Sequence, residues 1–179
     1  MKHMRAFYNF LIEEDYVQLN PFTKIKALKE AQDNIEVLSI DQLKTLLKQP
    51  DQRTYAGFRD YVLMMLLADT GMRISKALNL QQEDIDFKTN VIELNANNTK
   101  NRKTRYVPIS QNTSKLLREL LIEIEDFDTQ HIFATVYGNT VDPARFRQRL
   151  KMYGHIAGIK GVRVSPHTFR HTFAKVLFA

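Results

Sequence analysis

Apolar residues recur with helical spacing along most of the chain, and turn residues separate the periodic segments from one another. Residues 55–68 are almost wholly apolar, which is typical of a buried central helix. Gly71 follows closely and suits the left-handed conformation that ends many helices. The pattern predicts helices over residues 3–14, 39–49, 55–68, 74–80, 111–125, 143–157 and 165–179.

Signals typical of strands are confined to the middle of the chain. The segments 85–87, 91–94 and 106–109 are short and rich in Ile, Val and Leu, and Asn, Thr and Lys turns separate them. Pro108 cannot donate to a sheet ladder, which makes the third segment an edge or terminal strand. We therefore predict an α+β fold that is mostly α-helical, with a small three-stranded antiparallel sheet at one edge.

The chain divides into three parts at its N-terminal end. Asn20-Pro21 is a turn signal after the first helix, and residues 21–36 are polar and typical of a linker. The first helix carries an apolar stripe that needs a packing partner, either a preceding domain or the body of this one. We expect residues 1–20, 21–36 and 37–179 to be a terminal helix, a linker and the main domain.

The net charge of +6 is unevenly distributed. Residues 99–118 hold six basic and no acidic side chains, and residues 142–179 hold eight basic and one acidic. Residues 119–141, between these blocks, hold five acidic and no basic side chains. Two basic blocks fit a surface that binds a polyanion, and they fit a solvated basic surface without a partner equally well.

Composition also excludes several classes of protein. The chain has no Cys, which rules out disulfides and thiolate metal sites and fits a reducing, cytoplasmic setting. Its longest apolar run, Tyr61 to Ala68, is too short to cross a bilayer, and no secretory signal is evident in residues 1–30. A metal nuclease is disfavoured because Asp142 is the only acid in either basic block. We expect neither a metal nor a cofactor.

The last helix carries the most distinctive polar side chains. Ser165 can cap it, and Pro166 suits its first turn. His167, Arg170 and His171 then share one face, where an acid/base group lies beside a permanent cation. The opposite face is expected to be buried and carries Phe169, Phe173, Val176 and Leu177. Such a helix could bind a phosphate and move a proton beside it, although a lone His-x-x-Arg pair also fits an ordinary surface helix.

Four features occur together in a fixed order. They are Ala68-Asp-Thr-Gly-Met-Arg73, the basic segment around Lys100, the arginine-rich helix 143–157 and the His167-x-x-Arg170 pair. This order of Arg, Lys and His-x-x-Arg resembles the tyrosine recombinases, the phage integrase family. The N-terminal segment Arg-Ala-Phe-Tyr-Asn-Phe-Leu looks like the last helix of that family's core-binding domain. The resemblance covers nearly the whole chain and implies an integrase-like catalytic core.

The resemblance implies metal-independent phosphoryl transfer, in which a tyrosine attacks a DNA phosphodiester and a 5′-hydroxyl leaves. Arg73 and Arg170 would clamp the non-bridging oxygens of the transition state with their guanidinium groups. Lys100 would give a proton to the leaving oxygen. His167 would accept the proton of the tyrosine or orient it, and His171 would act directly, support another residue or pack.

The partner that the resemblance implies is double-stranded DNA. The family works as tetramers on DNA, whereas we predict a monomer in solution for this chain. The side chains expected to contact DNA come from both basic blocks and are Arg102, Lys103, Arg105, Arg145, Arg147, Arg149 and Lys151.

Two departures from the family pattern bear on activity. Lys76 occupies a position three residues after Arg73 where the family usually has an acid. In relatives the nucleophilic tyrosine follows the His-x-x-Arg pair, whereas all seven tyrosines of this sequence precede it. We expect a truncated recombinase of a mobile element or prophage, bacterial or phage-encoded, that is inactive alone. The alternatives are a non-catalytic DNA-binding remnant or regulator and, with less support, an RNA-binding helical protein.

Overall fold

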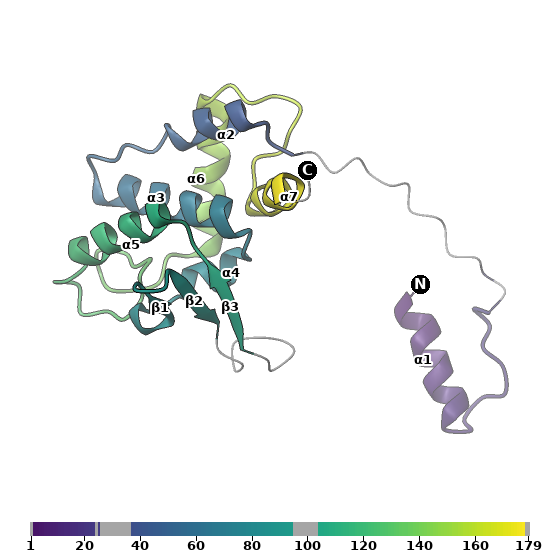
Figure 1. Cartoon of the computed structure of the whole chain (residues 1–179). Helices are drawn as coiled ribbons and strands as arrows, with labels where there is room; N and C mark the ends of the chain where they lie inside the picture. The colour runs from purple at the N-terminus through teal and green to yellow at the C-terminus, as the bar shows by residue number, and fades with distance from the viewer. Residues whose placement is uncertain (1, 24, 26–36, 95–103, 178–179) are drawn as a thin grey trace. The chain divides into compact units, whose positions relative to one another are not determined.

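The computed structural model describes residues 2–23, 25, 37–94 and 104–177. The chain forms two compact units, Met1–Ile35 and Glu36–Ala179. The predicted fold class is confirmed: the described residues are mostly helical, with a three-stranded antiparallel sheet (Figure 1). In these residues, no helix combines the length and the apolar character needed to span a bilayer.

The first unit consists of helix α1 (Lys2–Glu13) and a segment that folds back onto it. Asn20 is only 5% exposed, and its amide donates to the carbonyl of Arg5 (3.2 Å) and to the side chain of Asn9 (2.6 Å). Arg5 in turn donates to the carbonyl of Phe22 at 2.8 Å. The predicted apolar stripe is still half exposed within this unit, because Phe7 and Phe10 keep 54% and 51% of their surface.

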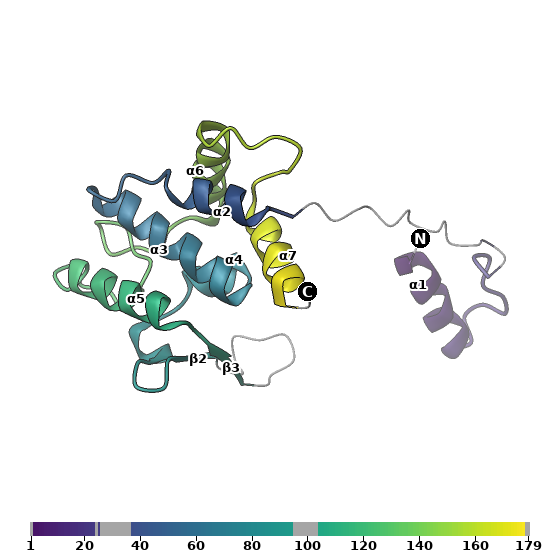
Figure 2. The same ribbon diagram turned by 45° about the horizontal axis from the view of Figure 1, so that its top comes forward.

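The second unit is built around α3 (Tyr55–Thr70), a helix whose middle is mostly buried. Figures 1 and 2 show α3 between α5 on one side and α7 on the other, with which it makes its main helical contacts. The other helices of this unit are α2 (Ile40–Leu47), α4 (Ile74–Leu78), α5 (Gln111–Glu123), α6 (Pro143–Ile156), α7 (Pro166–Leu177) and the short 3-10 helix η1 (Gln82–Asp84). Four helices have an N-cap side chain that accepts a hydrogen bond from a backbone N–H of the first turn: Ser39 for α2, Thr54 for α3, Ser110 for α5 and Asp142 for α6.

The sheet contains β1 (Ile85–Asp86), β2 (Val91–Leu94) and β3 (Arg105–Pro108), paired antiparallel in that order. Val91 pairs with Pro108 and Leu94 with Arg105, so β2 and β3 form a hairpin. Pro108 ends β3, which is an edge strand, as its missing N–H requires. The connection between these strands carries Lys100, Arg102 and Lys103, which lie outside the described residues.

Helix α7 differs in one respect from its predicted packing. Phe169 is buried, but Val176 and Leu177 keep 63% and 62% of their surface exposed. Thr172 is also buried, and its hydroxyl accepts a hydrogen bond from the backbone N–H of Leu38 at 3.0 Å. This long-range bond joins the start of the unit to α7, and the apolar spacing of α7 alone contains no sign of it.

Gly71 ends α3 as predicted, in the left-handed conformation with φ +58°. A Cβ added here would overlap the Phe173 side chain of α7, so glycine is needed both for the turn and for the close approach of α7. We expect Gly71→Ala to destabilise the fold by about 2–5 kcal/mol, since strain of about 1–2 kcal/mol adds to overpacking of about 1–3 kcal/mol.

Chemical unfolding of Gly71→Ala and Gly158→Ala separates the cost of backbone strain from the cost of the overlap with α7. Gly158 also has a positive φ (+66°), but an added Cβ would have nothing within 4 Å. Its replacement should therefore cost only the backbone strain of about 1–2 kcal/mol. Equal losses in the two variants would contradict a tight contact between Gly71 and α7.

Candidate functional site

The two arginines predicted to clamp a phosphate lie at the junction of α3, α4 and α7. The Nη1 of Arg170, on α7, donates to the carbonyl of Gly71 at 2.7 Å. Gly71 is two residues before Arg73, which immediately precedes α4 and whose side chain caps nothing. Both arginine side chains are exposed. The fold thus brings Arg170 to the segment that carries Arg73, although 97 positions separate them in the sequence.

Helix α7 has a side-chain cap at its N-terminus and carries an exposed polar face. The hydroxyl of Ser165 accepts a hydrogen bond from the backbone N–H of Thr168 at 3.3 Å, as expected of a helix cap. Phe169 faces the core, while His167, Arg170 and His171 are exposed. The structure therefore arranges the two histidines and Arg170 on one accessible face, as their spacing predicted.

This site is cationic. Lys76 lies on α4, three residues after Arg73 and half-buried. Among the residues that the structure describes, no carboxylate forms a salt bridge with Arg73, Lys76 or Arg170. Guanidinium groups without a carboxylate partner can bind the oxygens of an anion such as phosphate in bidentate fashion. In the same residues, no cluster of three His, Cys, Asp or Glu side chains could hold a metal ion.

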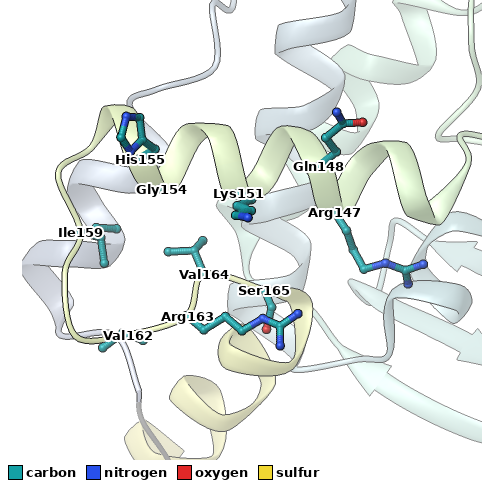
Figure 3. A pocket seen from close by; sticks show the side chains of 10 residues that line it. All are labelled: Arg147, Gln148, Lys151, Gly154, His155, Ile159, Val162, Arg163, Val164 and Ser165. Atoms are coloured by element: carbon teal, nitrogen blue, oxygen red, sulfur yellow. The ribbon is translucent and has the colours of Figure 1, made fainter.

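A second basic surface lies along α6. Arg147, Lys151 and His155 recur at intervals of four residues on one face of this helix, and Arg163 belongs to the segment that returns from it. Together they line a groove of about 710 Å³, with α6 on one side and residues 157–165 on the other (Figure 3). Arg145, also on α6, and Arg105, at the start of β3, are exposed outside the groove.

Gly154 keeps the returning segment close to α6. A Cβ added at Gly154 would lie 2.6 Å from Cγ2 of Val164, too close for any side chain at this position. His155 and Arg163 are groove residues that were not among those predicted from the sequence. The four-residue interval from Arg147 and Lys151 could have indicated His155, whereas Arg163 depends on how the segment folds back.

Arg149 requires a correction, because its guanidinium points into the protein. Its Nε and Nη2 donate to the two carboxylate oxygens of Asp60 on α3, at 2.5 and 2.8 Å. These bonds raise the pKa of Arg149. An alternation of arginines along α6 does not show which one meets a buried acid 89 residues away. We therefore remove Arg149 from the residues expected to contact DNA.

The fold is that of an integrase-like catalytic core. The model of the phage integrase family matches residues 36–179, and the chain belongs to that family. The chain is 34% identical over 178 residues to the tyrosine recombinase XerC of Oceanobacillus iheyensis. That alignment covers 96% of the chain but 57% of the relative, so the chain spans less than three fifths of the length of XerC.

Two solved structures share the fold. The XerA recombinase has a TM-score of 0.70 and 25% sequence identity, and the match covers 98% of this chain and 59% of XerA. The Tn1549 transposon integrase, solved in complex with a circular intermediate DNA, has a TM-score of 0.76. At 20% identity over 97% of this chain and 63% of the integrase, this second match shows the fold alone.

Proposed function

We propose that the chain is the catalytic domain of a site-specific DNA recombinase, which cleaves and rejoins DNA strands through a tyrosine–phosphate intermediate. The observation that carries this proposal is the hydrogen bond from Arg170 to the carbonyl of Gly71, which brings the two candidate clamp arginines to one junction. Membership of the phage integrase family supports it, as does the similarity to a tyrosine recombinase. We further propose that residues 1–20 are the last helix of a core-binding domain, that residues 21–36 are a linker, and that residues 37–179 belong to the catalytic domain.

In this proposal the protein side chains do the chemistry without a metal. A bond forms between the tyrosine oxygen and phosphorus while the bond from phosphorus to the 5′-oxygen breaks. Arg73 and Arg170 stabilise the negative charge on the non-bridging oxygens. His167 receives the proton of the tyrosine, and Lys100 gives a proton to the 5′-oxygen. We assign the nucleophile to no tyrosine of this sequence, because all seven precede His167.

We propose duplex DNA as the partner and the groove along α6 as part of the surface that holds it. Arg147, Lys151, His155 and Arg163 would contact phosphates there, and Arg102, Lys103, Arg105 and Arg145 would contact the backbone elsewhere. We propose that the chain is a monomer in the absence of DNA. Sedimentation of a stable dimer without DNA would contradict this last point.

Substitution of Lys151 tests the groove. We expect Lys151→Ala to weaken duplex binding on the order of fivefold and to reduce by about one the slope of log affinity against log salt, because one phosphate contact is lost. Lys115→Ala is the matched control: it removes the same charge from α5, where Lys115 is 76% exposed and lies 3.7 Å from Glu119. Fluorescence anisotropy at several salt concentrations measures both effects. Equal changes in the two variants would mean that only net charge matters, which would contradict the groove.

A further inference from the structure

Asp60 is a buried carboxylate that the proposed chemistry does not use. It lies on α3 with none of its surface exposed. Besides the two bonds from Arg149, it accepts a hydrogen bond from the hydroxyl of Tyr153 at 3.0 Å, and Nη2 of Arg59 lies 3.5 Å away. Burial, followed by the nearby Asp60 charge, raises the pKa of Tyr153 to about 12, so its hydroxyl remains a donor at neutral pH. Asp60 therefore binds two side chains of α6 at once.

These two side chains attach one face of α6 to α3. Arg149 and Tyr153 are one turn apart on the face that contacts α3. Arg147 and Lys151 each lie two residues from Arg149, which on a helix corresponds to a rotation of about 200°, onto the opposite face. Three hydrogen bonds to a single carboxylate, together with the buried apolar side chains of α6, hold both the rotation of α6 about its axis and its position along that axis. They thereby fix the direction in which the groove residues point.

The same part of α3 also holds the segment that leads into α6. Nη1 of Arg59 and the hydroxyl of Tyr55 both donate to the carbonyl of Ala134, at 2.8 and 2.7 Å. At the other end of α3, the carbonyl of Gly71 accepts the bond from Arg170. One rigid helix therefore carries the anchor of the groove helix at Asp60 and a contact of the candidate phosphate clamp at Gly71.

We propose that Asp60 is a positioning residue for DNA binding: through Arg149 and Tyr153 it fixes the basic face of α6 relative to the junction of Arg73 and Arg170. This inference rests on the proposed function, because it assumes that the basic face of α6 contacts DNA. A positioning role for Asp60 has one consequence that a purely structural role lacks. Weakening the hydrogen bonds of Asp60 to Arg149 and Tyr153 should remove the contribution of the groove residues to DNA affinity, while DNA contacts from other elements stay unchanged.

A double-mutant cycle measures that consequence. Arg149→Lys keeps the positive charge but loses the planar pair of donors that meets the two carboxylate oxygens of Asp60. We expect Arg147→Ala to weaken duplex binding on the order of fivefold in the unmodified chain and less than about twofold in the Arg149→Lys background. Arg105→Ala, on β3, is the matched control and should have the same effect in both backgrounds. Tyr153→Phe, which removes a single hydroxyl, provides a milder loosening that should reduce the effect of Arg147→Ala in the same direction.

The outcomes distinguish failure of the positioning role of Asp60 from failure of the proposed function. A smaller effect of Arg147→Ala with an unchanged effect of Arg105→Ala supports Asp60 as the positioning residue. Effects of Arg147→Ala that are the same in all backgrounds overturn it, even if the chain binds DNA well. If the unmodified chain binds no duplex, the proposed function fails first and the role of Asp60 in DNA binding fails with it. If Arg149→Lys does not fold, the cycle with Tyr153→Phe supports or overturns the role of Asp60 by the same comparison.

Discussion

Replacement of Arg170 with alanine is expected to slow DNA cleavage at least about 100-fold, while duplex affinity changes less than about tenfold. The reason is that Arg170 is proposed to bind charge that develops only in the transition state, and loss of one such donor lowers rates by about 100- to 1,000-fold. Affinity is shared among many phosphate contacts and changes less. The measurement is the rate of covalent complex formation on a nicked duplex, by a version of the chain extended with a recombinase segment that carries the nucleophilic tyrosine.

Two variants complete this test. Arg170→Lys keeps the charge but loses the planar pair of donors, so it should recover part of the rate and little of the bidentate contact. Arg145→Ala removes an exposed arginine of α6 and should change affinity but not the rate at saturating enzyme. A cleavage rate that survives Arg170→Ala would contradict the clamp and would favour a non-catalytic DNA-binding protein.

Replacement of Asp60 with alanine is expected to destabilise the fold by about 3–5 kcal/mol. The variant leaves Arg149 half-buried and Arg59 fully buried without the carboxylate that they share, and an unpaired buried charge is costly. Nε of Arg59 already has no hydrogen-bond partner among the described residues, so the cluster has no spare acceptor. Guanidinium unfolding followed by circular dichroism measures the change.

Comparison with an exposed ion pair tests whether burial causes the large loss of stability. Asp51 pairs with Arg53 at 2.9 Å, but the side chains are 50% and 90% exposed, so Asp51→Ala should have a far smaller effect. The double variant Asp60→Ala with Arg149→Met should be more stable than Asp60→Ala alone, because it removes one of the uncompensated charges. Similar losses for Asp51→Ala and Asp60→Ala would contradict the importance of the buried cluster.

The sequence predicted most of the architecture because its signals are local. The apolar run before Gly71 specified α3 and its end, and Ser39 and Ser165 marked the starts of two helices. Pro108 indicated an edge strand, and β3 ends at that residue. These features depend on a few neighbouring residues, so their physical causes can be read without knowing the rest of the fold.

The candidate site was only partly predictable, because several of its contacts join residues that are far apart in the sequence. The spacing of His167 and Arg170 placed both on one face of α7, but the bond from Arg170 to Gly71 joins residues 99 positions apart. The inward direction of Arg149 depends on Asp60, and buried Thr172 meets the backbone N–H of Leu38, which is 134 positions away. Contacts of this range leave no periodic signal. The chemical roles of Arg73, Lys100, His167 and Arg170 remain predictions, with Lys100 outside the described residues.

In the proposed mechanism Arg73 and Arg170 bind the same phosphate. A crystal structure of the chain with a duplex selected from a random pool tests it most directly. The predicted result is one phosphate with guanidinium nitrogens of both Arg73 and Arg170 within about 3 Å of its non-bridging oxygens. Binding of the two arginines to different phosphates, or DNA held along α6 with both arginines in solvent, would contradict the account.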